Sequence, residues 1–266
     1  MSRGFYETAE NCLALCDPDE KCSAVLAFAG AKEKENIEWD PEYPVKAIAA
    51  PGRPGHPELI HPSRVPRRRL GSAQGRAALV HAIAHIEFNA INLALDAAYR
   101  FRGMPRQYQF DWLSVAADEA RHFRLLELRL HAMGQVYGDF PAHNGLWEMA
   151  EKTADSCLMR MALVPRVLEA RGLDVTPGMI KRLAAAGDPD TVAALEVILA
   201  EEVRHVEIGT RWFRHCCKEE GLDSTETFLR LLQEHYKGMP RGPFNLAARY
   251  EAGFSKKEMQ ALTAGP

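Results

Sequence analysis

Two short stretches of this sequence are near-copies of each other, and they constrain the fold more than any other feature. Asp118–Phe123 and Glu201–Val206 each carry a glutamate followed three residues later by a histidine. On an α-helix this spacing places both side chains on one face, about 5–6 Å apart at Cβ, so that they can bind one metal ion together. The two pairs are Glu119 with His122 and Glu202 with His205.

A further glutamate precedes each pair at a matched distance. Glu87 stands 32 residues before Glu119, and Glu169 stands 33 residues before Glu202. The doubled pattern predicts a dinuclear metal site inside an all-α four-helix bundle, with one ligand-bearing residue or pair on each helix. The predicted ligands are Glu87, Glu119, His122, Glu169, Glu202 and His205.

The types of these ligands indicate which metals to expect. Four carboxylates and two imidazoles without a thiolate favour iron or manganese, as Fe/Fe, Mn/Fe or Mn/Mn, over structural zinc. Four carboxylates buried without a metal would repel one another and cost much desolvation energy. We therefore expect two metal ions, with iron favoured.

A third Glu-x-x-His match, Glu58 with His61, serves as a control. It lies in a stretch, residues 41–66, that holds seven prolines and cannot continue a helix. It has no upstream glutamate and no apolar face around it. We interpret it as a chance match.

Composition gives the class of protein and few clues to its partners. Apolar residues make up 47% and charged residues 26% of the 266 residues, as in ordinary globular proteins, and the net charge of -3 gives no general reason to expect nucleic-acid binding. The arginines at 53, 64, 67, 68 and 69 form a local basic cluster, interpreted as a solvated linker or a contact for an anionic partner. Six cysteines without a C-x-x-C pair, and no signal peptide or long apolar run, predict reduced thiols in a cytoplasmic protein without a membrane segment.

Hydrophobic periodicity and helix-capping residues predict the elements. Residues 4–34 are expected to be helical, and residues 41–66 to form either an extended arm that wraps the bundle or a partly mobile linker. Residues 72–102 and 106–133 are expected to form the first two long helices. The predicted organisation is residues 1–71 for N-terminal helices and arm, 72–221 for the bundle, and 222–266 for a C-terminal helical extension. The extension is expected to hold two short helices, one with a Ser255-x-x-Glu258 capping box.

The third and fourth helices require a different argument. If the two halves are related by a two-fold axis, the second and third helices run in the same direction. The connection between them must then cross the length of the bundle, which a short loop cannot do. We therefore expect a crossover helix at 145–154 and a third helix that starts near Asp155 or Ser156. Pro165 is expected to kink that helix just before Glu169. Gly172 should end it, a short helix should run from Thr176 to about Ala186, and a fourth helix should run from Asp188 to Gly221.

Other residues near the motif have structural interpretations. His81 and His85 lie on a face of the first helix away from Glu87, with Asn89, Asn92 and Asp96, and are expected to contact another element or solvent. Five aromatic residues either fill the core or line a substrate cavity. They are Phe88, Trp112, Phe123, Trp212 and Phe213.

These residues carry a resemblance to known families. The doubled motif resembles ferritin-like di-iron carboxylate proteins, and residues 162–174 resemble the uncharacterised ferritin-like family called domain of unknown function 455. The Glu-Ala-Arg-His-Phe stretch at 119–123 is also similar to a ferritin-like hydroxylase that modifies a tRNA adenosine. The resemblance implies the same six ligands, a ferritin-like fold and O2 chemistry at two iron ions. The broken third helix departs from simple ferritins and disfavours a storage cage.

Three functions remain open from the sequence. The first is an O2-activating oxidase or oxygenase that acts on a small-molecule substrate, with a nucleotide or tRNA as one alternative. The second is a ferroxidase or metal-handling protein without an organic substrate. The third is a structural helical bundle that binds a partner through the basic cluster. A homodimer is compatible with each of them.

Overall fold

The protein is all-α, as predicted. The computed structural model describes residues 4–33, 37–66, 69–236 and 240–264, and these contain helices and two isolated β-bridges but no β-strand. The chain divides into two compact units, residues 1–151 and 152–266. The predicted three-part organisation remains a prediction.

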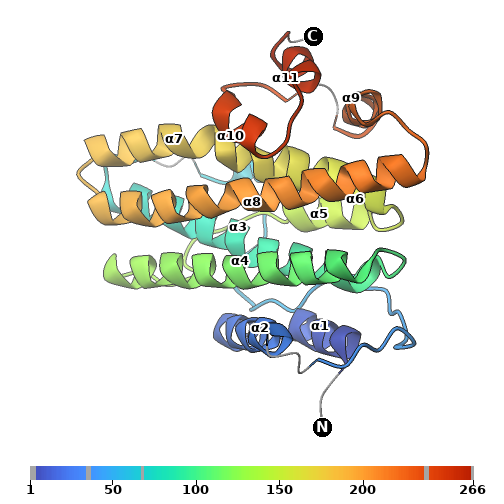
Figure 1. Ribbon diagram of the computed structural model, residues 1–266. Helices are drawn as coiled ribbons and strands as arrows, with labels where there is room; N and C mark the ends of the chain where they lie inside the picture. Colours follow the sequence, from blue (N-terminus) through green and yellow to red (C-terminus); the bar gives the residue numbers. More distant parts are fainter. Residues whose placement is uncertain (1–3, 34–36, 67–68, 237–239, 265–266) are drawn as a thin grey trace. The chain divides into compact units, whose positions relative to one another are not determined.

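The first unit contains two short N-terminal helices and two long helices (Figure 1). The long helices α3 and α4 lie side by side and form the most extensive helix pair of this unit. The helices α1 and α2 pack on α3 and α4, respectively. The bounds are α1 Phe5–Ala14, α2 Pro18–Glu33, the 3₁₀ turn η1 Pro62–Arg64, α3 Ala73–Arg100, α4 Arg106–Ala132 and α5 Gly145–Lys152.

The second unit contains a composite helix packed along one long helix. The composite helix is formed by α6, the π-helical segment η2 and α7, and each of the three contacts α8. The bounds are α6 Cys157–Leu163, η2 Val164–Glu169, α7 Ala170–Ala185, α8 Pro189–Glu219, α9 Ser224–His235, α10 Leu246–Glu251 and α11 Lys256–Ala264.

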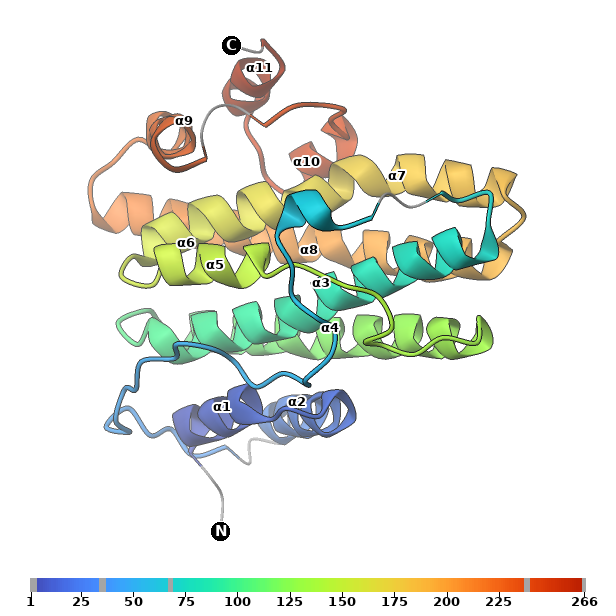
Figure 2. The same cartoon turned by 180° about the vertical axis from the view of Figure 1, so that it is seen from behind.

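The proline-rich arm is ordered and lies on the first unit, where Figure 2 shows it from behind. The indole Nε1 of Trp147 donates to the carbonyl of Ala49 over 3.2 Å, which ties the arm to α5. Further along the arm, Ile60 donates to Ala142 over 2.9 Å and Ala142 donates to Glu58 over 3.0 Å, both between backbone groups. These hydrogen bonds hold the proline-rich segment, which is non-helical apart from the 3₁₀ turn at Pro62–Arg64, against α5 and the loop that precedes it.

Several predicted helix starts are confirmed by their caps. Ser72, Ser156 and Asp188 accept hydrogen bonds from backbone amides three residues ahead, at 3.1, 3.2 and 3.2 Å. These caps satisfy amides that have no partner within the helix. The short helix α5 occupies the place predicted for a crossover helix.

The break predicted at Pro165 takes the form of a π-helix. Because proline has no N–H, the α-helical ladder cannot continue through it, and η2 carries the chain to Glu169 with a wider turn. Pro165 packs against Gly209 of α8, where a Cβ atom would clash with the proline ring. A glycine on α8 therefore allows η2 to approach this closely.

The break predicted at Gly172 was wrong. The helix α7 continues through Gly172 and also through Pro177, which lies inside it. Pro177 leaves the carbonyl of Leu173 without its usual helical donor, but the side-chain amide of Asn245 donates to that carbonyl over 3.3 Å. The distant partner replaces the missing hydrogen bond, so the helix does not end.

The number of C-terminal helices was also underestimated. Among the described residues beyond Gly221 there are three helices, α9, α10 and α11, instead of two. The additional one, α10, has only six residues, too few to give a periodic pattern. The predicted capping box is confirmed: Ser255 N donates to Glu258 Oε2 over 2.7 Å, and Glu258 N donates to Ser255 Oγ over 3.1 Å.

The C-terminal helices are attached through a buried ion pair. Arg166 of η2 contacts Glu258 of α11 over 2.6 Å, and both side chains are almost fully buried. The guanidinium also lies 4.0–4.7 Å from the ring centroids of Phe213, Phe228 and Phe254. The segment that carries Glu169 is therefore held in place by residues near the end of the chain.

The structure tests the predicted basic cluster and the predicted absence of a membrane segment only in part. Arg53, Arg64 and Arg69 are exposed, whereas Arg67 and Arg68 of the predicted basic cluster lie outside the described residues. The helix α3 is long and apolar enough to span a membrane, but 78% of its most apolar window is buried in the protein, as in a core helix. The cytoplasmic location stays a prediction.

Candidate metal centre

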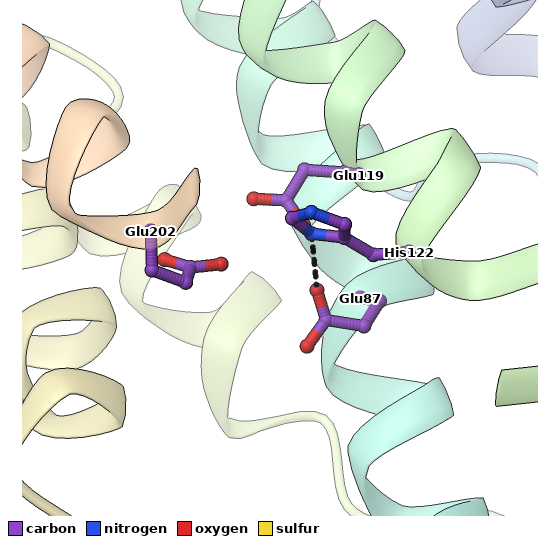
Figure 3. Close-up of side chains that lie close together, drawn as sticks. All are labelled: Glu87, Glu119, His122 and Glu202. Carbon is purple, nitrogen blue, oxygen red and sulfur yellow. Dashed lines mark hydrogen bonds and ion pairs between the residues drawn. The ribbon is translucent and has the colours of Figure 1, made fainter. Parts of the chain in front are cut away.

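Three of the six predicted ligands meet in the first unit. Glu87 comes from α3, and Glu119 and His122 come from adjacent turns of α4. Each offers a ligand atom within 4.8 Å of those of the other two. His122 Nδ1 lies 3.3 Å from Glu87 Oε2 and 3.3 Å from Glu119 Oε2 (Figure 3). All three side chains are buried, at 4% exposure or less.

The electrostatics of this cluster call for a cation. Burial lowers the pKa of His122, but hydrogen bonds to Glu119 and Glu87 raise it more strongly, to about 11. Without a metal, a proton on the imidazole therefore offsets part of the charge of the two carboxylates. A metal ion can take over this role when the imidazole loses its proton, and the mixture of carboxylate oxygens and one imidazole nitrogen suits iron or manganese. The residues of this cluster fit a metal ion.

The second unit repeats part of this arrangement. Glu202 and His205 lie on the same face of α8, and His205 Nδ1 is 3.6 Å from Glu202 Oε1. The imidazole is fully buried, and Glu202, also drawn in Figure 3, is nearly so. Glu169 is partly buried and ends η2, the segment that packs on α8.

The control motif and the neighbouring histidines stay apart from this cluster. Glu58 and His61 are exposed on the arm, and His61 Nδ1 contacts Ser63 Oγ at 2.8 Å. His85 contacts the hydroxyl of Tyr137 at 2.9 Å, and His81 Nε2 accepts from the backbone of Gly138 over 2.9 Å. Both histidines therefore hold the loop after α4, as their position away from Glu87 predicted.

Tyr137 is the residue near this cluster that the sequence pattern did not single out. Its ring packs against Phe88 and Phe123, the neighbours in sequence of two ligands, at centroid distances of 5.7 and 5.1 Å. The tyrosine lies in a short loop between Gly134 and Gly138, which both have positive φ. The glycines allow the turn that brings Tyr137 back to the helices, but the contacts of Tyr137 cannot be read from the sequence.

The five aromatic residues proposed for a core or a cavity are all buried. Phe88 and Phe123 pack together at 5.5 Å, and Phe88 also lines a cavity beneath the arm. Phe213 packs on Phe228 at 6.1 Å, within the apolar surroundings of Arg166. Most of the five aromatic residues therefore fill the core of the protein.

Comparison with known proteins assigns a family to this fold. Residues 14–260 match the family model described as "Protein of unknown function (DUF455)". The chain belongs to the DUF455 family. A relative from Haemophilus influenzae, described as an uncharacterized protein, is 43% identical over 267 residues, covering 96% of this chain and 92% of the relative. No solved structure matches the chain. Membership of DUF455 agrees with the resemblance noted in residues 162–174 and carries no function with it.

Proposed function

We propose that this DUF455 protein is a di-metal carboxylate oxidoreductase that activates O2, built as a ferritin-like four-helix bundle. The observation that carries the proposal is the buried cluster of Glu87, Glu119 and His122 on α3 and α4. Buried carboxylates that converge on one imidazole are costly unless a cation joins them.

The repeat supplies the second half of the proposed centre. Glu169, Glu202 and His205 have the same residue types in the same order, and Glu202 and His205 share one face of α8. We assign one histidine to each metal ion and treat the four carboxylates as shared or terminal ligands. Two divalent ions together would supply two of the four electrons that reduce O2 fully, and the substrate would supply the other two as it is oxidised.

The protein's own contribution is to position and shield these groups. The i, i+3 spacing fixes each glutamate–histidine pair on a rigid helix. Phe88 and Phe123 are adjacent to Glu87 and His122 in sequence, are buried and pack on each other at 5.5 Å, so they form part of the apolar core on these two helices. Iron is the favoured metal, with manganese or a mixed pair as the alternative.

Anaerobic titration with Fe(II), followed by exposure to O2, tests this function. We expect two ions per chain and a transient visible absorption band on mixing with O2. Glu119→Gln and Glu202→Gln should each reduce the bound iron, whereas Glu58→Gln on the arm should not. Fewer than one ion per chain would refute the proposal. Two ions that oxidise while the protein forms large closed shells would instead identify a metal-storage protein.

A further inference from the structure

The polar face of α3 that points away from Glu87 is covered by the proline-rich arm. His85 on this face has both ring nitrogens engaged: Nε2 lies 3.1 Å from the carbonyl of His143, and Nδ1 lies 2.9 Å from the hydroxyl of Tyr137. Nε2 also lies 3.1 Å from the amide Nδ2 of Asn89, so three groups hold the ring. The side chain of His85 is therefore held in one position at the wall of this region.

The arm and this face of α3 enclose a cavity of about 70 Å³ within the first unit. A single water molecule needs only about 10–15 Å³ measured in this way, so the space admits a ligand of several heavy atoms. Trp147 forms one wall, and its indole is fixed by the hydrogen bond to the arm at Ala49. The cavity is thus bounded by side chains that are held in place by other contacts.

One residue that lines this cavity has an acceptor without a donor among the described residues. Asn89 is 6% exposed, and its amide Nδ2 donates to the backbone carbonyl of His85 over 2.8 Å. That bond fixes which end of the amide is nitrogen, so the oxygen Oδ1 is directed elsewhere. In the described parts of the chain no donor reaches Asn89 Oδ1, so this oxygen can accept a hydrogen bond from a ligand in the cavity that Asn89 lines.

An arginine of the arm lines the same cavity. The Arg53 guanidinium donates to the carbonyl of Pro54 over 3.5 Å, and no carboxylate lies within ion-pair distance of it among the described residues. Its charge reaches into the cavity: burial raises the pKa of Tyr137, and the charge of Arg53 partly opposes that rise. A guanidinium with free N–H groups matches a carboxylate in geometry.

We propose that this cavity binds a small carboxylate that carries a hydrogen-bond donor, as a 2-hydroxy acid does. The carboxylate pairs with Arg53, and the donor satisfies Asn89 Oδ1. A dianionic phosphate fits less well, because Glu151 also lines the cavity and adds a negative charge. The inference goes beyond the proposed metal chemistry and does not depend on it.

Glycolate is the probe, and the indole N–H of Trp147 is the reporter. In metal-free protein labelled with ¹⁵N-tryptophan, the Trp147 resonance can be assigned with Trp147→Phe. We expect glycolate to shift this resonance in a saturable way. Acetate lacks the hydroxyl and glycolamide lacks the charge, so both should bind more weakly.

Two arginine variants of the arm test whether glycolate binding depends on a charge inside the cavity or on any positive charge of the arm. Arg53→Gln should weaken glycolate binding at least about ten-fold, because it removes a charge-assisted pair. Arg64→Gln removes the same charge from an exposed position of the arm outside the cavity, and should leave binding unchanged. No shift with glycolate, or equal losses in the two variants, would overturn the proposal. Equal binding of acetate and glycolate would overturn the role of Asn89.

Discussion

Gly209 of α8 lies directly against the ring of Pro165, with no room for a Cβ atom between them. This contact holds the π-helical segment that ends at Glu169. Gly209 also follows His205 by one helical turn, so the close approach and the histidine share one face of α8. The close packing of the π-helical segment on α8 in the second unit therefore requires a glycine at position 209.

Replacing this glycine should destabilise the second unit. Gly209→Ala forces a methyl group into the proline ring and should lower the free energy of unfolding by about 1–3 kcal/mol. Gly172→Ala is the matched control, because a Cβ there meets nothing within 4 Å and alanine favours the helix by about 0.5–1 kcal/mol. Chemical denaturation checks both, and a Gly209→Ala variant as stable as the wild type would contradict the contact.

The buried ion pair of Arg166 and Glu258 should matter far more than an exposed one. Glu258→Gln keeps the volume but leaves the arginine charge buried without compensation, which should cost about 3–5 kcal/mol. Glu234→Gln breaks an exposed pair with Arg230 of similar length, 2.9 Å, and should cost less than about 1 kcal/mol. Urea unfolding of the two variants measures the difference, and equal costs would argue against the burial of Arg166.

A buried lysine should make stability depend on pH. Lys21 is fully buried and donates to the carbonyls of Leu13 and Gly52 and to the side chain of Asn92. Burial lowers its pKa from 10.5 to about 7. Above about pH 7 the unfolded chain therefore binds more protons than the folded one, so the free energy of unfolding rises with pH.

The measurement is the slope of stability against pH for wild type and Lys21→Met between about pH 7 and 8.5. We expect the slope to be smaller in the variant, and unchanged in Lys181→Met, which alters an exposed lysine. Above about pH 9 the buried thiols of Cys12 and Cys22, whose pKa burial raises, act in the opposite direction. Parallel slopes for wild type and Lys21→Met would show that Lys21 keeps its proton throughout.

Metal binding should stabilise the folded protein. A metal that binds only the folded state at 100 times its dissociation constant adds about 2.7 kcal/mol to the free energy of unfolding. Thermal unfolding with Mn(II), which avoids oxidation, should show this gain in the wild type and lose it after addition of a chelator. His122→Ala should abolish the gain, whereas His61→Ala should retain it. An equal gain in both variants would place the metal elsewhere.

Local signals in the sequence were sufficient for the main helices. Ser72, Ser156 and Asp188 bond to amides three residues ahead, so their caps can be read without knowledge of the fold. The sequence predicts a break in the helix at Pro165. It does not predict that the break is a π-helix, because that form depends on the close contact between Pro165 and Gly209 of α8.

The errors came from partners distant in sequence. Pro177 remains inside α7 because Asn245, 72 residues after Leu173, supplies the missing donor. In the candidate site, periodicity placed Glu119 and His122 on one face, and Glu87 met them as expected. Tyr137 was missed because a loop residue has no periodicity, and its contacts depend on how the loop folds back.

The pair of Arg166 and Glu258 also has a consequence for the order of events during synthesis. The two residues are 92 positions apart, so Arg166 leaves the ribosome long before its counter-charge exists. At roughly 5–20 residues per second the delay is about 5–18 seconds. During that time the arginine must stay hydrated, and the π-helical segment with Glu169 cannot settle into its apolar surroundings. The π-helical segment therefore reaches its final packing only after α11 has emerged from the exit tunnel.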